Sequence, residues 1–337
     1  MEDSITIVLD SKDLLSGVCG ANDGNLKVIE GSLGGRIAAR GNEIRLEGVD
    51  ETRARYFKSM MDNLIDVVRE GENPSPEYVR ALAGTFFSGN PPEDSVSAGE
   101  NPPFAENSGE FPPLRDAVIQ IPHGFHRVYP RGRNQAAYVR GMRSCDISFC
   151  VGPAGTGKTY LAIAEALRLV LSKKMRKLVL TRPVVEAGEN LGFLPGDLTQ
   201  KINPYLRPLY DAMESLIPFE VIRRMEETRV IEIAPLAYMR GRSLNDCVVI
   251  LDEAQNTTKE QMKMFLTRIG EGARAMVTGD TTQIDLPGRV DSGLLHAVKI
   301  LSGVEGIFFA FFHTADVVRN PLIKKIIQAY NDNEKKS

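Results

Sequence analysis

One stretch of the sequence carries residues whose types and spacing suit phosphate chemistry. Residues 152–159 read Gly-Pro-Ala-Gly-Thr-Gly-Lys-Thr and match the pattern G-x-x-x-x-G-K-[ST] at every fixed position. In such a loop, glycines let backbone N–H groups wrap a phosphate chain, the lysine neutralises the β- and γ-phosphates, and the final hydroxyl can bind Mg²⁺. We therefore expect a nucleotide site, with ATP as its ligand, formed by Gly152, Pro153, Ala154, Gly155, Thr156, Gly157, Lys158 and Thr159.

The residues on either side of this loop predict the elements that must position it. Apolar residues 147–151 precede the loop, and residues 160–171 follow it with the apolar spacing of a helix. Strand, loop and helix in this order direct the helix N-terminus, with its partial positive charge, towards the bound phosphates.

Two adjacent carboxylates follow another apolar run further along the chain. Residues 247–251 predict a buried strand whose end presents Asp252 to Mg²⁺, together with Thr159. Glu253 is then placed to polarise an attacking water molecule. The second carboxylate is typical of proteins that hydrolyse nucleoside triphosphates, and it disfavours the alternative of a P-loop phosphotransferase.

A third segment, residues 276–283, also puts polar residues at the end of a predicted strand. Gln283 in this segment is a candidate sensor of the γ-phosphate that would couple hydrolysis to movement. The alternative is a polar loop in which Gln283 only contacts solvent.

Apolar runs alternate with helical stretches throughout the second part of the chain. This alternation predicts βαβ units, an α/β fold with a mainly parallel, buried sheet flanked by helices, and ligands at the carboxyl ends of its strands. The predicted strands are residues 147–151, 178–180, 230–234, 248–251, 275–277 and 307–312.

The first part of the chain predicts a separate, smaller domain. Residues 1–72 have the order β-α-β-β-α of a small α+β domain, and residues 116–337 form the larger domain. Residues 73–115 are expected to be an acidic, proline-rich linker that begins with a short helix at residues 74–82. Residues 89–113 cannot bury enough apolar surface to offset the entropy of ordering.

The small domain resembles a KH-like nucleic-acid-binding domain. Gly31-Ser32-Leu33-Gly34 spells the G-x-x-G of a KH loop, although a strand rather than a second helix is expected to follow it. RNA contact and a role in packing or partner docking are both open for this domain.

Composition indicates a cytoplasmic protein with no membrane association. The formal net charge is −3, from 41 basic and 44 acidic residues, so nucleic-acid binding would need a local basic patch. The N-terminus lacks the features of a secretory signal, and no apolar run is long enough for a transmembrane helix.

The three motifs, taken in order, resemble the first motor lobe of superfamily-one helicases. Further stretches resemble the PhoH family, in its bacterial PhoH-like (YbeZ-type) branch, over roughly residues 116–330. This resemblance implies a RecA-like P-loop NTPase fold. The stretches that carry it are residues 181–189, 191–197, 237–242, 288–289, 292–294 and 316–319.

The resemblance also implies roles for residues outside the three motifs. Gln135 is the candidate for reading adenine, since an amide both donates and accepts hydrogen bonds. Arg182 and Glu189 follow the second predicted strand, where such motors touch nucleic acid or transmit the nucleotide state. A surface ion pair is the alternative for these two residues.

A catalytic arginine is expected to come from another subunit. Because the chain ends at Ser337, soon after the last predicted strand, we expect no second motor lobe. The candidates are Arg319, Arg240 and Arg242, in that order. The family usually has histidine where this chain has Asn320, so a histidine role there is in doubt. The resemblance implies a homo-oligomer, expected to be a hexameric ring.

The motifs thus predict an Mg²⁺-dependent ATPase, and the family resemblance implies that it acts on RNA. The family resemblance implies RNA remodelling, with ribosomal-RNA maturation beside a YbeY-type endoribonuclease as the expected setting. The alternative is a nucleotide-gated scaffold that recruits a nuclease without remodelling RNA itself. Intrinsic RNA cleavage is not expected, because no constellation of spaced acidic residues stands on strands at either end of the chain.

Overall fold

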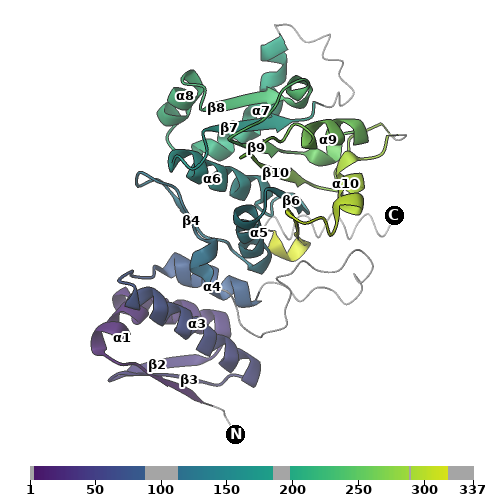
Figure 1. Cartoon of the computed structure of the whole chain (residues 1–337). Coiled ribbons are helices and arrows are strands. Elements are labelled where there is room, and N and C mark those ends of the chain that lie inside the picture. The colour runs from purple at the N-terminus through teal and green to yellow at the C-terminus, as the bar shows by residue number, and fades with distance from the viewer. Residues whose placement is uncertain (1–3, 88–112, 185–197, 288–289, 318–337) are drawn as a thin grey trace. The chain divides into compact units, whose positions relative to one another are not determined.

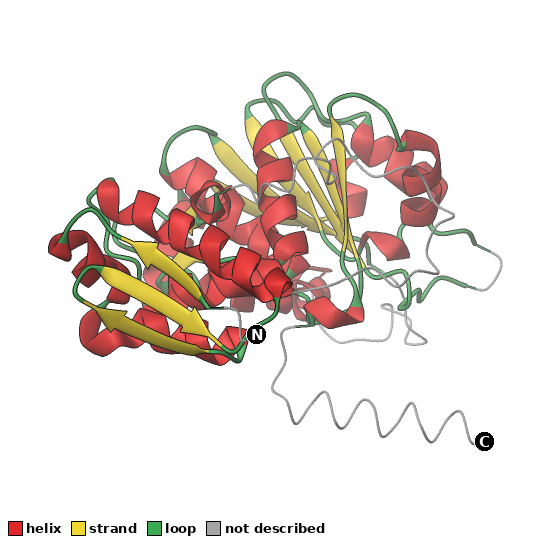
Figure 2. Ribbon diagram, turned by 90° about the horizontal axis from the view of Figure 1, so that it is seen from below, coloured by secondary structure: helices red, strands yellow, loops and turns green. Residues whose placement is uncertain are grey.

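The structure, a computed structural model, divides the chain into two compact units, each with its own hydrophobic core. It describes residues 4–87, 113–184, 198–287 and 290–317. The first unit comprises residues 4–87, 113–118 and 129–136, and the second comprises residues 119–128 and the described residues from 137 onwards. Figure 1 traces both units along the chain, and Figure 2 shows their strands and helices by colour.

Over residues 4–87, the first unit combines a three-stranded antiparallel sheet with four α-helices. The strand order is β1-β3-β2, and β2 and β3, which are consecutive in the chain, form an antiparallel hairpin. Its elements are β1 (Ile5–Val8), α1 (Lys12–Cys19), α2 (Gly24–Leu33), β2 (Arg36–Arg40), β3 (Glu43–Glu47), α3 (Glu51–Arg69) and α4 (Pro76–Phe87).

Helix α1 was not predicted from the sequence. The helix is short and contains Gly17, which lowers intrinsic helix propensity. Its N-terminus is capped by the side chain of Ser11, which accepts a hydrogen bond from Leu14 N at 3.1 Å. A Cβ atom at Gly17 would lie 2.6 Å from a methyl carbon of Val68 on α3, so glycine permits the close packing of the two helices. Tertiary packing therefore outweighs the weak local signal.

The G-x-x-G sequence does not form a loop between two helices. Gly31 and Leu33 belong to the last turn of α2, and Gly34 ends that helix with a left-handed φ of 71°. The chain then enters β2 directly. The connection between two helices is instead residues 20–23, which join α1 to α2. The proposed match of residues 31–34 to a KH loop is therefore wrong, and the KH-like character of the unit stays a prediction.

The segment expected to be a linker begins with a packed helix. Val79 and Leu82 on α4 are buried in the core of the first unit, as is Leu114 beyond it. The first unit thus extends past the predicted boundary at residue 72, because the apolar face of α4 has a partner surface that the sequence alone does not display. Residues 88–112 of the predicted linker lie outside the described residues.

The second unit confirms the predicted α/β fold. All six predicted strands form one sheet of order β11-β6-β10-β9-β7-β8, and every neighbouring pair is parallel. The strands are β6 (Ile147–Val151), β7 (Lys177–Arg182), β8 (Ile231–Pro235), β9 (Cys247–Leu251), β10 (Arg274–Gly279) and β11 (Ile307–Phe311). A short hairpin, β4 (Ile119–Gln120) with β5 (Arg127–Val128), was not predicted.

Helices cover both faces of this sheet, as Figure 2 shows. Neighbouring strands place Phe149, Val277 and Leu251 in register, and these side chains pack with Phe265 on α9 and Leu294 on α10. Helix α6 packs against β7, β9 and β10. The helices are α5 (Arg133–Ser144), α6 (Lys158–Leu171), α7 (Leu198–Glu214), α8 (Phe219–Glu227), α9 (Lys259–Leu266) and α10 (Gly293–Leu301). No helix in the described part of the chain is long and apolar enough to span a membrane.

An ion-pair cluster joins β8, the outermost strand on one side of this sheet, to its neighbour β7. Glu232 on β8 accepts hydrogen bonds from Arg242 and from Lys177 on β7. The bond from Arg242 is the largest cause that lowers the pKa of Glu232 from 4.5 to about 2. A pKa that is lower in the folded chain adds stability above the unfolded value, and this stability is lost as pH falls towards the folded value.

We therefore expect Glu232→Gln to lose less stability than the wild type as pH falls below about 4.5. Urea-unfolding midpoints measured from about pH 6 to about pH 3 would check this expectation. Glu227→Gln, a change to an exposed ion pair on α8, is the matched control and should follow the wild type. An equal acid-induced loss in Glu232→Gln and wild type would contradict the expectation.

Candidate nucleotide-binding site

The order of the strands brings the three predicted motifs to one edge of the sheet. The P-loop follows β6, Asp252 and Glu253 follow β9, and β10 lies between these two strands. Because all three strands are parallel, their carboxyl ends meet at the same edge. Hydrogen bonds confirm the proximity, since Ala154 N donates to Asp280 Oδ2 at 2.8 Å and Thr159 Oγ1 donates to Asp252 Oδ1 at 2.6 Å.

The P-loop backbone is shaped by its glycines. Gly155 and Gly157 have left-handed φ angles of 77° and 84°, which glycine adopts without steric cost. Gly152 lies so close to the chain after β11 that an added Cβ atom would meet Phe312 O at 2.5 Å. The loop leads directly into α6, whose N-terminus is suited to bind an anion. The backbone therefore fits the phosphate cradle predicted from the sequence.

Lys158 lies inside this loop, with only 8% of its surface exposed. Its Nζ donates to Gly152 O at 2.6 Å and to Pro153 O at 2.8 Å. Burial lowers the pKa of Lys158, and the charges of Asp280 and Asp252 act in the opposite direction. The ammonium is thus held by neutral carbonyl oxygens, a set of partners that phosphate oxygens would replace with stronger, charge-assisted bonds.

The residues predicted to hold Mg²⁺ are in contact. Asp252 is 5% exposed, and its Oδ1 accepts hydrogen bonds from Thr159 Oγ1 and from Thr278 Oγ1, the latter at 2.7 Å. Within the described ranges, no group of three or more His, Cys, Asp or Glu side chains could hold a metal by itself. Mg²⁺ usually takes one or two protein oxygens and completes its shell with water and substrate phosphates, so Thr159 and Asp252 fit this ion. Thr278 lies in the segment 276–283 that the sequence singles out, near the end of β10, but its residue type alone predicted no role for it.

Glu253 adopts a left-handed conformation, with φ 52° and ψ 39°, directly after β9. Its Oε1 lies 2.9 Å from Arg182 Nη2, and its Oε2 accepts a hydrogen bond from Gln255 Nε2 at 2.5 Å. Arg182 thus forms an ion pair, which was one of the two roles considered for it. Its partner is Glu253, the predicted catalytic glutamate. Arg182 therefore belongs to the site.

A network of side chains connects Glu253 to the P-loop. Gln255 Nε2 also donates to Gln283 O at 3.1 Å, and Asp280 N donates to Gln255 Oε1 at 3.0 Å. Asp280 in turn accepts hydrogen bonds from Ala154 N and from Gln283 Nε2, the latter at 2.9 Å. Gln283 thus lies in the site, whereas its role as a γ-phosphate sensor stays a prediction. Gln255 was not singled out from the sequence, although it stands two residues after Glu253.

Of the remaining candidate residues, Gln135, Arg240 and Arg242 lie within the described ranges. Gln135 is on α5, is 4% exposed, and its Oε1 accepts a hydrogen bond from Arg131 N at 2.7 Å; its adenine role stays a prediction. Arg240 is exposed, whereas both Nη atoms of Arg242 donate to Glu232. Arg319 and Glu189 fall outside the described residues.

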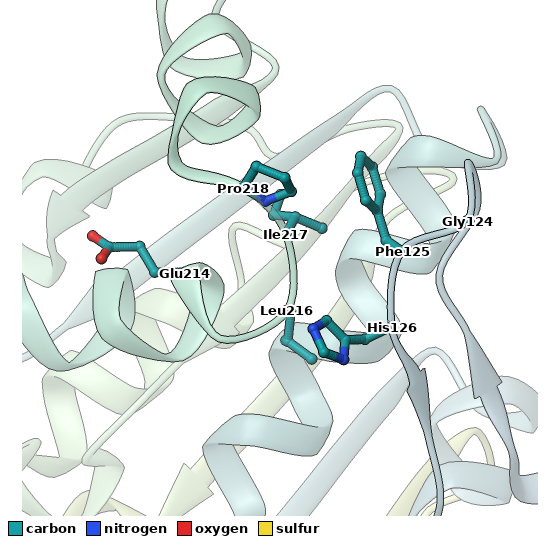
Figure 3. Close-up of a pocket in the computed structure, with 7 residues that line it drawn as sticks. All are labelled: Gly124, Phe125, His126, Glu214, Leu216, Ile217 and Pro218. Carbon is teal, nitrogen blue, oxygen red and sulfur yellow. The ribbon is translucent and has the colours of Figure 1, made fainter.

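A pocket of about 410 Å³ lies in another part of the second unit, between the turn of the β4–β5 hairpin and the connection from α7 to α8. In Figure 3, Phe125 and His126 extend from the hairpin towards Leu216 and Ile217, and the Glu214 carboxylate points away from them. The lining consists of Gly124, Phe125, His126, Glu214, Leu216, Ile217 and Pro218. None of these residues belongs to the P-loop or to the side chains that follow β9 and β10. The lining mixes apolar, acidic and imidazole side chains, which indicates no particular ligand.

Two solved structures show a distant likeness to this chain. The Sulfolobus solfataricus SWI2/SNF2 ATPase core in complex with dsDNA is 14% identical, with a TM-score of 0.32, over 51% of this chain and 34% of that one. The Pif1 helicase from Candida albicans is also 14% identical, with a TM-score of 0.28, over 53% of this chain and 39% of that one.

Sequence comparisons find much closer relatives. The PhoH-like protein of Mycobacterium tuberculosis is 44% identical over 318 residues, which are 94% of this chain and 85% of the relative. The PhoH-like protein of Bacillus subtilis is 42% identical over 324 residues, 96% of each chain. Protein PhoH of Escherichia coli is 41% identical over 206 residues, 60% of this chain and 58% of that one. The family model described as PhoH-like protein matches residues 127–331. With its P-loop and strand-end carboxylates, this chain is a P-loop nucleotide-binding protein that belongs to the PhoH family.

Proposed function

We propose that this chain is an Mg²⁺-dependent ATPase that acts on RNA. The contact between Thr159 Oγ1 and Asp252 Oδ1, with Glu253 as the next residue, carries the ATPase part of the proposal. It places two oxygens suited to Mg²⁺ beside a carboxylate that can take a proton from water.

Each residue of the cluster has a role in the proposed reaction. The P-loop N–H groups and Lys158 bind and orient the phosphates of ATP, and Thr159 and Asp252 hold Mg²⁺, which supplies neutralisation of phosphate charge when bound. Glu253 accepts a proton from the attacking water as the water oxygen bonds to the γ-phosphorus. The bond from the γ-phosphorus to the β–γ bridging oxygen breaks, and ADP and phosphate leave. Gln283 is the proposed sensor of the γ-phosphate, and its hydrogen bond to Asp280 connects it to the P-loop.

Assembly into a ring would complete the site. In the proposed homo-hexamer, an arginine of the neighbouring subunit stabilises charge on the transferred phosphoryl group. Arg319 and the exposed Arg240 are the candidates. Arg242 is a weaker one, because its guanidinium would first have to leave Glu232.

The RNA part of the proposal rests on the resemblance to helicase motor lobes and to the PhoH-like branch. A net charge of −3 means that RNA would be bound by a local surface, for which the N-terminal unit is the candidate. An endoribonuclease of the YbeY type is the proposed partner in ribosomal-RNA maturation.

The proposal is tested by measuring ATP turnover of the purified full chain with single-stranded RNA, duplex RNA and single-stranded DNA of the same sequence. We expect single-stranded RNA to raise kcat at least about fivefold and the effect to weaken as salt is added, since phosphate contacts are electrostatic. Turnover that is Mg²⁺-dependent but indifferent to every nucleic acid would contradict the RNA part. It would favour the nucleotide-gated scaffold, whose nuclease partner should then bind in an ATP-dependent manner.

A further inference from the structure

The carboxylate of Glu253 is held from two sides. Arg182 Nη2 pairs with Oε1 at 2.9 Å, and Gln255 Nε2 donates to Oε2 at 2.5 Å. The side chains of the ion pair are only 19% exposed for Arg182 and 34% exposed for Glu253. Water and salt therefore screen this pair less than they screen a surface ion pair.

Gln255 connects Glu253 to the residues that follow β10. Its side chain is fully buried and is fixed by two further hydrogen bonds, with Gln283 O and with Asp280 N. Both partners follow β10, the strand between β9 and the P-loop strand β6. Moving Gln255 would leave buried polar groups without hydrogen bonds, which costs free energy. The hydrogen bond from Gln255 to Glu253 is therefore harder to break than the ion pair with Arg182.

Arg182 holds the same carboxylate from the opposite side. It is the last residue of β7, and the order β6-β10-β9-β7 puts β7 across β9 from the P-loop strand. The ion pair therefore ties Oε1 of Glu253 to β7, whereas the loop that would hold the phosphates follows β6. Proton transfer needs the base within hydrogen-bond reach of that water.

We propose that Arg182 is a positioning residue that restrains the general base of the ATPase reaction. With the ion pair closed, as in the structure, Glu253 is turned towards β7. When the pair opens, Glu253 stays bonded to Gln255 and turns its other oxygen to the attacking water. The inference rests on the proposed ATPase activity and adds to it the residue that limits the basal rate.

The first test is steady-state ATP turnover by Arg182→Gln in the full chain, without RNA. We expect kcat to rise about three- to tenfold, because the arrangement with the free base becomes more populated. The Kd for ATPγS should change less than about twofold, because the P-loop and the Mg²⁺-binding residues are untouched. A merely structural role for Arg182 predicts a lower kcat instead, and that result would overturn the proposal.

Three further variants of the chain test whether Arg182 acts through Glu253. Arg182→Lys keeps a positive charge and should stay closer to the wild-type kcat than Arg182→Gln. Adding Arg182→Gln to Glu253→Gln should give no increase in rate, because the restrained base is already absent. The matched control is Arg223→Gln on α8, whose exposed ion pair with Glu227 lies outside the site, and which should leave kcat unchanged. An increase of similar size in the Glu253→Gln background would refute the mechanism.

Opening of the ion pair between Arg182 and Glu253 can also be measured without ATP hydrolysis, through the melting temperature. A double-mutant cycle of Arg182→Gln and Glu253→Gln on the melting temperature should show coupling for the protein alone. With saturating Mg²⁺ and ATPγS, the coupling should fall by about half or more. Coupling that persists unchanged would show that the pair does not open. A chain that binds ATPγS but never hydrolyses ATP would refute the proposed ATPase activity, whereas the cycle would still decide whether nucleotide opens the pair.

Discussion

Replacing Glu253 by glutamine is expected to slow ATP turnover by about 100- to 10,000-fold while nucleotide binding is retained, because a general base contributes on that scale. Glutamine keeps the size of the side chain and can still bond to Gln255, but it cannot accept the proton of the attacking water. The Kd for a fluorescent ATP analogue should therefore change little, since Glu253 stands beside the phosphate cradle and not in it. Turnover by a coupled phosphate-release assay and Kd by titration together measure the two effects.

A matched variant separates loss of the base from loss of a surface charge. Glu227→Gln removes a carboxylate that lies exposed on α8 and pairs with Arg223, and it should leave both kcat and Kd unchanged. If Glu253→Gln retained more than about a tenth of the wild-type kcat, another group would have to supply the base, and the assignment of Glu253 would be wrong.

Replacing Lys158 by alanine is expected to weaken ATP binding by about 100-fold, the scale of losing hydrogen bonds to a charged group. The ammonium sits within the loop against Gly152 O and Pro153 O, so its positive charge is already where the β- and γ-phosphates would bind. Isothermal titration with ATPγS and Mg²⁺ measures the loss directly. Turnover at sub-saturating ATP should fall at least as far.

The fold must be shown to survive this substitution, because the lysine is nearly buried. Circular dichroism and a melting curve would establish that Lys158→Ala is folded. Lys259→Ala is the matched control, since it removes a partly exposed lysine that pairs with Asp291 on the surface. Wild-type affinity in a folded Lys158→Ala protein would disprove the assignment of the P-loop as the ATP site.

Several features of the second unit follow from the sequence alone. Strands of a parallel sheet are buried on both faces, so each appears as a continuous apolar run, and all six were identifiable in this way. The P-loop was equally clear, because the spacing of its glycines, Lys158 and Thr159 is required by the geometry of a phosphate chain. Asp252 was identified by its position directly after an apolar strand.

The N-terminal unit shows where local signals were too weak. Helix α1 is held by its cap and by the close packing of Gly17 on Val68, and α4 is held by apolar contacts with the first core. The contact of Gly17 with Val68 and the core contacts of α4 join residues that are far apart in sequence, so propensity and periodicity did not predict α1 or the packing of α4. The G-x-x-G sequence matches a KH loop in residue types alone, because Gly34 ends α2 and β2 follows it, in agreement with the strand expected there.

The sequence by itself determined the P-loop, the strands that carry it, and the residues that follow those strands. Only the tertiary structure decided which of these residues meet, because strand order is set by long-range packing and not by the order of motifs along the chain. With β10 between β6 and β9, Asp280 reaches Ala154 N and Thr278 reaches Asp252. With β7 beside β9, Arg182 reaches Glu253, a contact between two residues that stand 71 positions apart (253 minus 182) and that no pattern in the sequence connects.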